Sequence, residues 1–387
     1  MRLTRIFSEF FRSEKTGGMI LLGCTVMSVL AANTPLSDAY VAFWHRTIDL
    51  SFPLFRLAFI IRDWIDDGLM AVFFLLVGLE IKREFYQGEL SGVRKALLPA
   101  LAAAGGMIVP ASIHLFLNRG TSTHAGFGIP MATDIAFALG VLSLLGSRVP
   151  PSLKVFLTAL AIIDDLGAII VIAVFYTLDI SLMYLGSALG IFALLLVLQR
   201  LKVRHLAVFI LPGVLMWYCM VRSGIHPTIA GVLLAFAVPS GTDDSHSPSY
   251  RLQHLLHTPV AFIVLPVFAL ANTGIRFEQN WYLGLAEPNS LGILLGLVFG
   301  KPAGIVLFSA CAVATGLCTL PEETDWRQIA GTGILGGIGF TMSIFVANLA
   351  FTDMHLVDSS VIAVLVSSVI AGLGGFLLLS GGRRQPR

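Results

Sequence analysis

About twelve apolar runs recur along the chain, each long enough to cross a ~30 Å hydrocarbon core as a helix of roughly 20 residues. Their centres lie near positions 24, 76, 106, 134, 163, 190, 213, 231, 263, 302, 338 and 370. The run near 231, which ends by Pro239, is the shortest. The continuity of these runs excludes the short alternating strands of an outer-membrane barrel. The sequence predicts an all-α polytopic membrane protein with about twelve transmembrane helices.

The composition agrees with this class, because 56% of the 387 residues are hydrophobic and only 12% are charged. No polar linker separates the runs, and the longest polar stretch spans only positions 240–250. We therefore expect one transmembrane domain over residues 1–387. The four cysteines show no paired spacing, so we expect neither a disulfide framework nor a bound metal cluster. We also expect no cofactor and no nucleic-acid partner.

The positive residues are unevenly distributed among the segments between the runs. Most of the 25 Lys and Arg residues fall in alternate segments that include both ends of the chain. Positive residues are enriched on the cytoplasmic side of membrane proteins, so both termini are expected in the cytoplasm. Lys301 is the exception, since it lies inside an apolar run.

The segment 34–62, between the first two runs, has its own pattern. Residues 47–52 alternate polar and apolar side chains before Pro53, which is typical of a strand. A small outer β-hairpin is one reading. An interfacial amphipathic segment anchored by Phe43, Trp44 and Phe55 is the other.

Two runs contain residues that interrupt helices. Gly126, Gly128 and Pro130 fall in the fourth run, and a cluster of glycines at 331–339 falls in the eleventh. Each is the second of three runs, in trios covering residues 94–175 and 290–382, and corresponding runs in the two trios have opposite directions. Taken singly, such residues also fit close packing or a kink. Together they predict an inverted repeat with two broken helices, a pattern associated with transporter sites.

Asp164 and Asp165 lie side by side in the middle of the apolar run 156–175. A carboxylate at the bilayer centre costs about 2.5–3.5 kcal/mol, so two need a functional reason. Asp164 follows Lys154 by ten residues, or about 15 Å of helix. The same counting places Asp134, beside Thr133, and Lys301 near the midplane.

These groups suggest ion exchange. One aspartate can bind a cation with help from Asp134, Thr133 or freed carbonyls, while the other pairs with Lys301. Oxygen ligands favour a hard cation such as Na⁺, and a proton competes for the same carboxylate. The alternative is a set of structural ion pairs, which are usually poor stabilisers.

Further charged residues lie toward the two faces. Glu80 and Glu84 end the second run, and His254 and His257 share a helix face at the start of the ninth. Ordinary surface pairing explains both groups, and a pH-responsive mouth is the alternative. Asp67 opens the second run near the outer surface, where acidic groups would concentrate cations.

Five segments closely resemble the NhaA family of bacterial sodium/proton antiporters, and the likeness extends from about residue 10 to the end of the chain. They are residues 70–84 (MAVFFLLVGLEIKRE), 132–141 (ATDIAFALGV), 159–168 (ALAIIDDLGA), 300–302 (GKP) and 336–345 (GGIGFTMSIF).

The resemblance implies a twelve-helix exchanger of the bacterial inner membrane that expels Na⁺ or Li⁺ for more than one proton, and is therefore electrogenic. It implies a homodimer joined through a hairpin near residues 45–58, and a role in pH homeostasis. Asp164 and Asp165 match the ion- and proton-carrying pair, which would make them the Na⁺ and Li⁺ ligands.

The likeness also assigns roles to other residues. Lys301 matches the partner lysine, and Thr133 and Asp134 fall at the crossed broken helices, where Asp134 would compensate their dipole ends. A final group falls in the pH-sensing region: Glu80, Glu84, His254 and His257. Gln253 departs from the family pattern, which has glutamate there, and this puts the pH set point in doubt.

Two rival functions use similar residues. A sodium-coupled solute symporter could share the broken helices, but no arginine lies within a run to hold an anionic solute. An intramembrane aspartyl protease would need two aspartates from facing helices, which Asp134 and Asp165 could imitate. The protease reading leaves Lys301 and the paired interruptions unexplained.

Overall fold

The computed structural model describes residues 2–51, 56–88, 92–177, 180–240, 247–277 and 279–381. Its contacts divide the chain into two compact units, each described here by itself. Unit 1 comprises residues 1–19, 84–171 and 277–387, and unit 2 comprises residues 20–83 and 172–276. The single-domain expectation is not tested by this division and stays a prediction.

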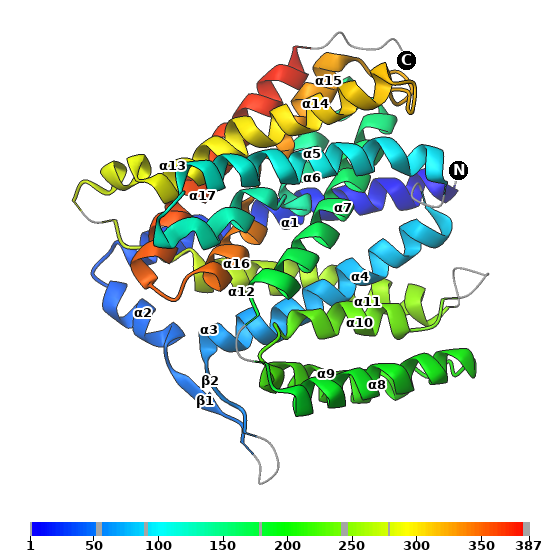
Figure 1. Ribbon diagram of the computed structural model, residues 1–387, viewed down its shortest axis with the longest axis vertical. Helices are drawn as coiled ribbons and strands as arrows, with labels where there is room; N and C mark the ends of the chain where they lie inside the picture. Colours follow the sequence, from blue (N-terminus) through cyan, green and yellow to red (C-terminus); the bar gives the residue numbers. More distant parts are fainter. Residues whose placement is uncertain are drawn as a thin grey trace. The chain divides into compact units, whose positions relative to one another are not determined.

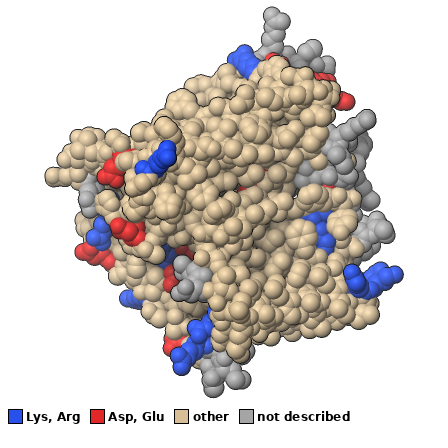
Figure 2. Space-filling model, viewed as in Figure 1, with Lys and Arg blue, Asp and Glu red and all other residues tan. Residues whose placement is uncertain are grey.

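The described residues are overwhelmingly helical, as the apolar runs predict (Figure 1). Six helices are long and apolar enough to cross a membrane, or up to nine if each bent pair counts as one span. A helix satisfies its own backbone hydrogen bonds, which is why apolar segments adopt it in lipid. Figure 2 shows a face dominated by uncharged residues, with charged side chains in small groups. The fold is that of a multi-pass membrane protein.

Unit 1 is built around two helices that lie side by side, α5 and α14 (Figure 1). Their backbones touch, because a Cβ atom on Gly304 would collide with the carbonyl oxygen of Gly105. Small residues allow this approach between membrane helices. The elements wholly within unit 1 are α5 (Val93–Leu117), η3 (Ser122–Met131), α6 (Ile135–Leu144), η4 (Gly146–Arg148), η7 (Trp281–Ala286), α13 (Pro288–Leu295), η8 (Gly296–Gly300), α14 (Lys301–Ala314), α15 (Trp326–Gly336), α16 (Phe340–Ala350) and α17 (Met354–Ser380).

Both predicted interruptions are present in unit 1. The axis bends by 42° between η3 and α6, and by 45° between α15 and α16. Residues 132–134 connect the first pair without helical structure, and Pro130 stands near the end of η3. Residues 337–339 separate the second pair. The prediction of two broken helices is confirmed.

Unit 2 packs its helices around a separate apolar cluster that includes Phe209, Met216 and Leu234. α4 and α10 approach closely, because a Cβ atom on Gly78 would lie 2.7 Å from that of Ala235. The elements wholly within unit 2 are α2 (Ser37–Trp44), β1 (Thr47–Asp49), β2 (Ala58–Ile60), α3 (Ile61–Asp63), η1 (Trp64–Leu69), α8 (Leu182–Arg200), α9 (Ala207–Ser223), α10 (Thr228–Ala237), α11 (Pro248–Pro259), η6 (Val260–Val264) and α12 (Leu265–Asn272). Three helices continue from one unit into the other: α1 (Arg2–Ala32), α4 (Met70–Gln87) and α7 (Pro151–Phe175).

The predicted hairpin is confirmed as a two-stranded antiparallel sheet. β1 pairs with β2, with Ile48 opposite Phe59. The segment before it is also helical, since α2 ends at Trp44 and leaves Phe43 exposed. The segment therefore contains the hairpin and also a short helix that ends in two of the expected anchor residues, Phe43 and Trp44. The third expected anchor, Phe55, lies outside the described residues.

Candidate functional site

Asp164 and Asp165 lie halfway along α7, a 25-residue helix that is apolar on either side of them. Asp164 is 0% exposed and Asp165 is 1% exposed. Withdrawing a carboxylate from water is costly unless partners compensate it. The side-chain partners of Asp164 come from two other segments of unit 1: α14 and the connection between η3 and α6.

The first partner is the ammonium of Lys301, which is itself 0% exposed. Its Nζ atom lies 2.7 Å from Oδ2 of Asp164, and it also donates to the carbonyl oxygen of Met131, the last residue of η3. Lys301 interacts electrostatically with Asp165 as well. The lysine therefore joins α14, α7 and the end of the first broken helix.

The second partner is Thr133, in the extended connection between η3 and α6. Its Oγ1 atom lies 2.7 Å from Oδ2 of Asp164 and 2.9 Å from the carbonyl oxygen of Gly336. A hydroxyl has one hydrogen to donate, so the two acceptors compete for it. Gly336 ends α15, so Thr133 connects the aspartate to the second broken helix.

Asp134 joins the starts of the second halves of the two broken helices, α6 and α16. Its Oδ1 atom accepts from the amide of Phe137 at 2.9 Å and caps α6. Its Oδ2 atom accepts from Thr341, at 3.2 Å from the amide and 2.5 Å from the hydroxyl, in the first turn of α16. A carboxylate near helix N-termini opposes their partial positive charge. One buried side chain thus serves two helix ends.

Two buried carboxylate oxygens of the pair, Oδ1 of Asp164 and Oδ1 of Asp165, accept no hydrogen bond from the residues that the structure describes. A buried acceptor without a donor is costly, and oxygen is the ligand that hard cations prefer. In the described chain, no cluster of three or more His, Cys, Asp or Glu side chains has the arrangement of a resident metal centre.

The structure therefore brings together five residues that the sequence singled out, all within unit 1: Thr133, Asp134, Asp164, Asp165 and Lys301.

The sequence reasoning missed several contributors. Thr341 shares the cap of Asp134, and Ser343 donates to the carbonyl oxygen of Ile129 at 2.7 Å. Thr341 lies in the first turn of α16, after the N-cap residue Gly339, and no sequence pattern marked it as a partner of Asp134. The carbonyl groups of Met131 and Gly336 give no signal in the sequence.

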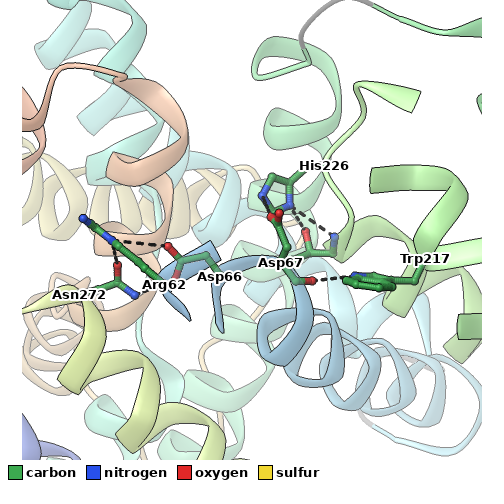
Figure 3. A network of polar contacts seen from close by, with 7 residues as sticks. Arg62, Asp66, Asp67, Trp217, His226 and Asn272 are labelled. Carbon is green, nitrogen blue, oxygen red and sulfur yellow. Dashed lines mark hydrogen bonds and ion pairs between the residues drawn. The ribbon is translucent and has the colours of Figure 1, made fainter. Parts of the chain in front are cut away.

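Asp67, the expected outer entrance, lies in unit 2 within the polar network of Figure 3. Nε2 of His226 lies 3.4 Å from its carboxylate, and the indole of Trp217 donates to its carbonyl oxygen at 2.8 Å. Burial lowers the pKa of His226 to about 3. The imidazole is therefore neutral at physiological pH, and its Nδ1 accepts from the amide of Thr228. The hydrogen on Nε2 then points to Asp67.

Asp66, the neighbour of Asp67, has separate partners in the same network (Figure 3). The amide of Asn272 donates to its Oδ1 atom at 2.7 Å, and Nε of Arg62 donates to Asn272 at 2.8 Å. The two adjacent carboxylates are thus held by different elements. An ion-collecting role for Asp67 stays a prediction.

The residues expected to sense pH lie on two helices. Glu80 and Glu84 are half-buried on α4, whereas His254 on α11 is exposed and His257 is half-buried. The ring of His254 stacks on Tyr250, with centroids 5.3 Å apart. Each of the four residues is placed on its own helix, and a shared role in sensing pH remains a prediction.

A multi-pass helical fold with a buried ammonium and carboxylates between two broken helices is that of a membrane ion transporter. Comparison with known proteins agrees. The family model described as Na+/H+ antiporter 1 matches residues 8–379. The chain belongs to this family of Na⁺/H⁺ antiporters, and it is a transporter rather than an enzyme.

Full-length relatives support the same assignment. The chain is 60% identical over 384 residues to "Na(+)/H(+) antiporter NhaA" of Dechloromonas aromatica, covering 98% of this chain and 96% of the relative. It is 57% identical over 379 residues to "Na(+)/H(+) antiporter NhaA 1" of Flavobacterium johnsoniae, covering 98% and 97%. A relative from Bordetella parapertussis with the name "Na(+)/H(+) antiporter NhaA" is 47% identical over 385 residues, covering 98% and 97%. Family membership sets aside the symporter and protease readings.

Proposed function

We propose that the chain exports Na⁺, or Li⁺ in its place, in exchange for more than one proton, with Asp164 and Asp165 as the carrying groups. One observation carries this proposal, namely that the two oxygens of Asp164 have different surroundings. Oδ2 accepts from Lys301 and Thr133, whereas Oδ1 has no hydrogen-bond partner within the described residues. One half of the carboxylate is neutralised, and the other half is available to an ion.

The exchange depends on competition for the same oxygens. Na⁺ needs several oxygen ligands, and the carboxylates, the Thr133 hydroxyl and the Gly336 carbonyl supply them near one point. A proton on either carboxylate removes a negative charge and weakens cation binding. Without Na⁺, the ammonium of Lys301 neutralises the carboxylate of Asp164. When Na⁺ binds, the cation neutralises the carboxylate instead. The ammonium then becomes free to rearrange, and proton binding reverses the change.

The broken helices let the site face either side of the membrane. Non-helical backbone is tolerated at membrane depth where it lines a cavity or is buried in protein. Thr133 connects the ion-carrying aspartate to Gly336, and Asp134 joins the starts of α6 and α16. A change of charge at Asp164 is therefore transmitted to both breaks. Exchange of one Na⁺ for more than one proton moves net charge, and each charge gains about 2.3 kcal/mol per 100 mV of membrane potential.

The architecture that we propose has twelve spans and an inverted repeat. One repeat is α5, the bent pair η3–α6 and α7. The other is α13–α14, the bent pair α15–α16 and α17. In each repeat the bent pair is the second of the three spans, and the two bends are similar, 42° and 45°. This correspondence supports the pairing. The short helices α9 and α10 count as two of the remaining spans.

The cellular setting is part of the same proposal. We place the protein in a bacterial inner membrane with both termini in the cytoplasm, because positive residues concentrate in the segments on that side. A homodimer joined through the β1–β2 hairpin is supported by the exposed side chains of β1. Asp67 would collect cations at the outer mouth. Four residues would set the response to pH: Glu80, Glu84, His254 and His257.

Proteoliposomes holding the purified protein and an acidic interior test the function. Adding Na⁺ or Li⁺ outside should collapse the pH gradient, and an imposed membrane voltage should change the rate, because charge moves. A collapse that requires an added organic solute would contradict the proposal. So would a rate that is independent of voltage, which would remove the electrogenic stoichiometry.

A further inference from the structure

A buried chain of hydrogen bonds in unit 1 is formed by residues outside the ion site. It joins His114 on α5, Asn289 on α13 and Ser360 on α17, which are 0%, 3% and 0% exposed. His114 Nε2 lies 3.2 Å from Oδ1 of Asn289. Nδ2 of Asn289 donates to the hydroxyl of Ser360 at 2.8 Å. Three membrane helices are thus tied by side chains alone.

The direction of each hydrogen bond follows from the last one. The Ser360 hydroxyl donates to the carbonyl oxygen of Leu356 at 2.6 Å, so it accepts from the amide of Asn289. That orientation leaves the amide oxygen of Asn289 facing His114, whose Nε2 must then be the donor. His114 accordingly carries a hydrogen on Nε2. Its Nδ1 atom has no hydrogen-bond partner among the described residues.

The imidazole ring is also held by close packing. A Cβ atom on Gly292 would lie 2.8 Å from Cδ2 of His114, and one on Gly126 would lie 3.2 Å from its Cε1. The backbones of α13 and η3 therefore approach two edges of the ring. A ring enclosed in this way cannot turn without moving a helix, so its hydrogen bond to Asn289 has a fixed geometry.

The span that Asn289 anchors is the span that carries Lys301. α13 continues through the π-helical segment η8 directly into α14, whose first residue is Lys301. A π turn contains one residue more than an α turn. If η8 relaxed to an α-helix, the two sides of the span would rotate relative to each other by about 100°. The ammonium would then point away from Asp164.

The segment's own residues do not fix its helical form. Two of its five residues are glycine, and Pro302, just after Lys301, has no amide hydrogen, so the turn before it lacks one hydrogen bond in either form. On the inner side, Gly304 contacts the backbone of Gly105 on α5. On the outer side, two polar ties join the end of α5 to the same span: the bond from His114 to Asn289, and the bond from the side-chain amide of Asn118, the C-cap of α5, to the carbonyl oxygen of Pro288 at 3.0 Å. The helix α5 is thus attached on both sides of the π turn.

We propose that the His114–Asn289–Ser360 chain fixes the rotation of the span that carries Lys301, which makes His114 and Asn289 positioning residues for the ammonium. The inference rests on the proposed function only for its transport readout. Its structural readout is the strength of the Asp164–Lys301 ion pair, which can be measured without transport.

The transport test compares four variants in proteoliposomes. H114L removes the donor and should raise the KM for Na⁺ about tenfold, which corresponds to roughly 1.4 kcal/mol. H114Q places an amide nitrogen near the position of Nε2 and should restore most of the loss. S360A should show a smaller rise. S367A is the matched control, because the Ser367 hydroxyl donates only to Ala363 in its own helix.

The structural test uses melting temperature in detergent. K301M should lower the melting temperature less in the H114L background than in the wild type, because H114L has already weakened the ion pair. Equal decreases in both backgrounds would overturn the proposal, as would a wild-type KM in H114L. If D164N and D165N still exchange ions, the proposed function fails, but the melting comparison still decides the positioning role.

Discussion

At the scale of the residue, Thr133 occupies the most informative position. Its single hydrogen is shared between the carboxylate of Asp164 and the carbonyl of Gly336. When the carboxylate is ionised, the hydrogen favours it, because hydrogen bonds to charged groups are the stronger ones. When a proton or Na⁺ neutralises the carboxylate, the carbonyl competes better. The threonine thereby links the charge of the site to a broken helix.

Replacing Thr133 by Val keeps the shape and removes this link. A hydrogen bond to a charged group contributes about 1.5–3 kcal/mol, so we expect the KM for Na⁺ to rise at least roughly tenfold. Thr158→Val on α7 is the control, since Thr158 donates only to Lys154 of its own helix. Uptake of radioactive Na⁺ at varied concentrations measures both. Equal KM values for the two variants would show that the Thr133 hydroxyl has no part in binding.

At the scale of the element, the interruptions were predictable, whereas their contacts were not. Glycine and proline at 126–130 and 331–339 indicated where the helices break. Asp134 and Thr341, however, are 207 positions apart in the chain, and local patterns carry no information on which side chains meet over such a distance. The π turn before Lys301 and the buried His114 were missed for the same reason. The π turn packs against α5, and His114, on α5, is enclosed by Asn289 and by the backbones of α13 and η3.

The contact between α5 and α14 gives a prediction about stability. Gly304→Ala should destabilise the protein by about 1–3 kcal/mol, a typical cost of overpacking. The added methyl group would meet the backbone of Gly105, which cannot move aside as a side chain can. Gly186→Ala on α8, where nothing lies within 4 Å of the added atom, should be neutral or stabilising by up to about 1 kcal/mol. Melting temperatures in one detergent compare the two, and an equally tolerated Gly304→Ala would refute the close contact.

At the scale of the whole molecule, the sequence indicated the class of protein more fully than the number of membrane spans. Apolar runs, charge bias and one pair of carboxylates pointed to a multi-pass ion exchanger. The structure adds the contacts that join the broken helices, including the carboxylate of Asp134 that α6 and α16 share. The number of spans stays a prediction because bent pairs and short helices such as α10 are ambiguous by length alone. Met131 and Gly336 contact the site through their backbone carbonyl oxygens. Every residue type possesses such an oxygen, so the sequence does not mark these two residues.

Competition between Na⁺ and protons predicts how the whole transporter responds to pH. Because both occupy the same carboxylates, the KM for Na⁺ should fall as the pH on the binding side rises. Where the carboxylates are mostly protonated, the decrease should approach tenfold per pH unit for each proton displaced. The maximal rate should change less. A KM that is constant across the active pH range would contradict shared occupancy.

The central claim is that Asp164 and Asp165 carry the exchanged ions. The most direct test is the uptake of radioactive Na⁺ into proteoliposomes, driven by an imposed pH gradient. Asp353→Asn is the control, because Asp353 caps α17 and is exposed. D164N and D165N should each reduce uptake to the level of empty liposomes while the control keeps the wild-type rate. Wild-type uptake by the double variant D164N/D165N would contradict the account.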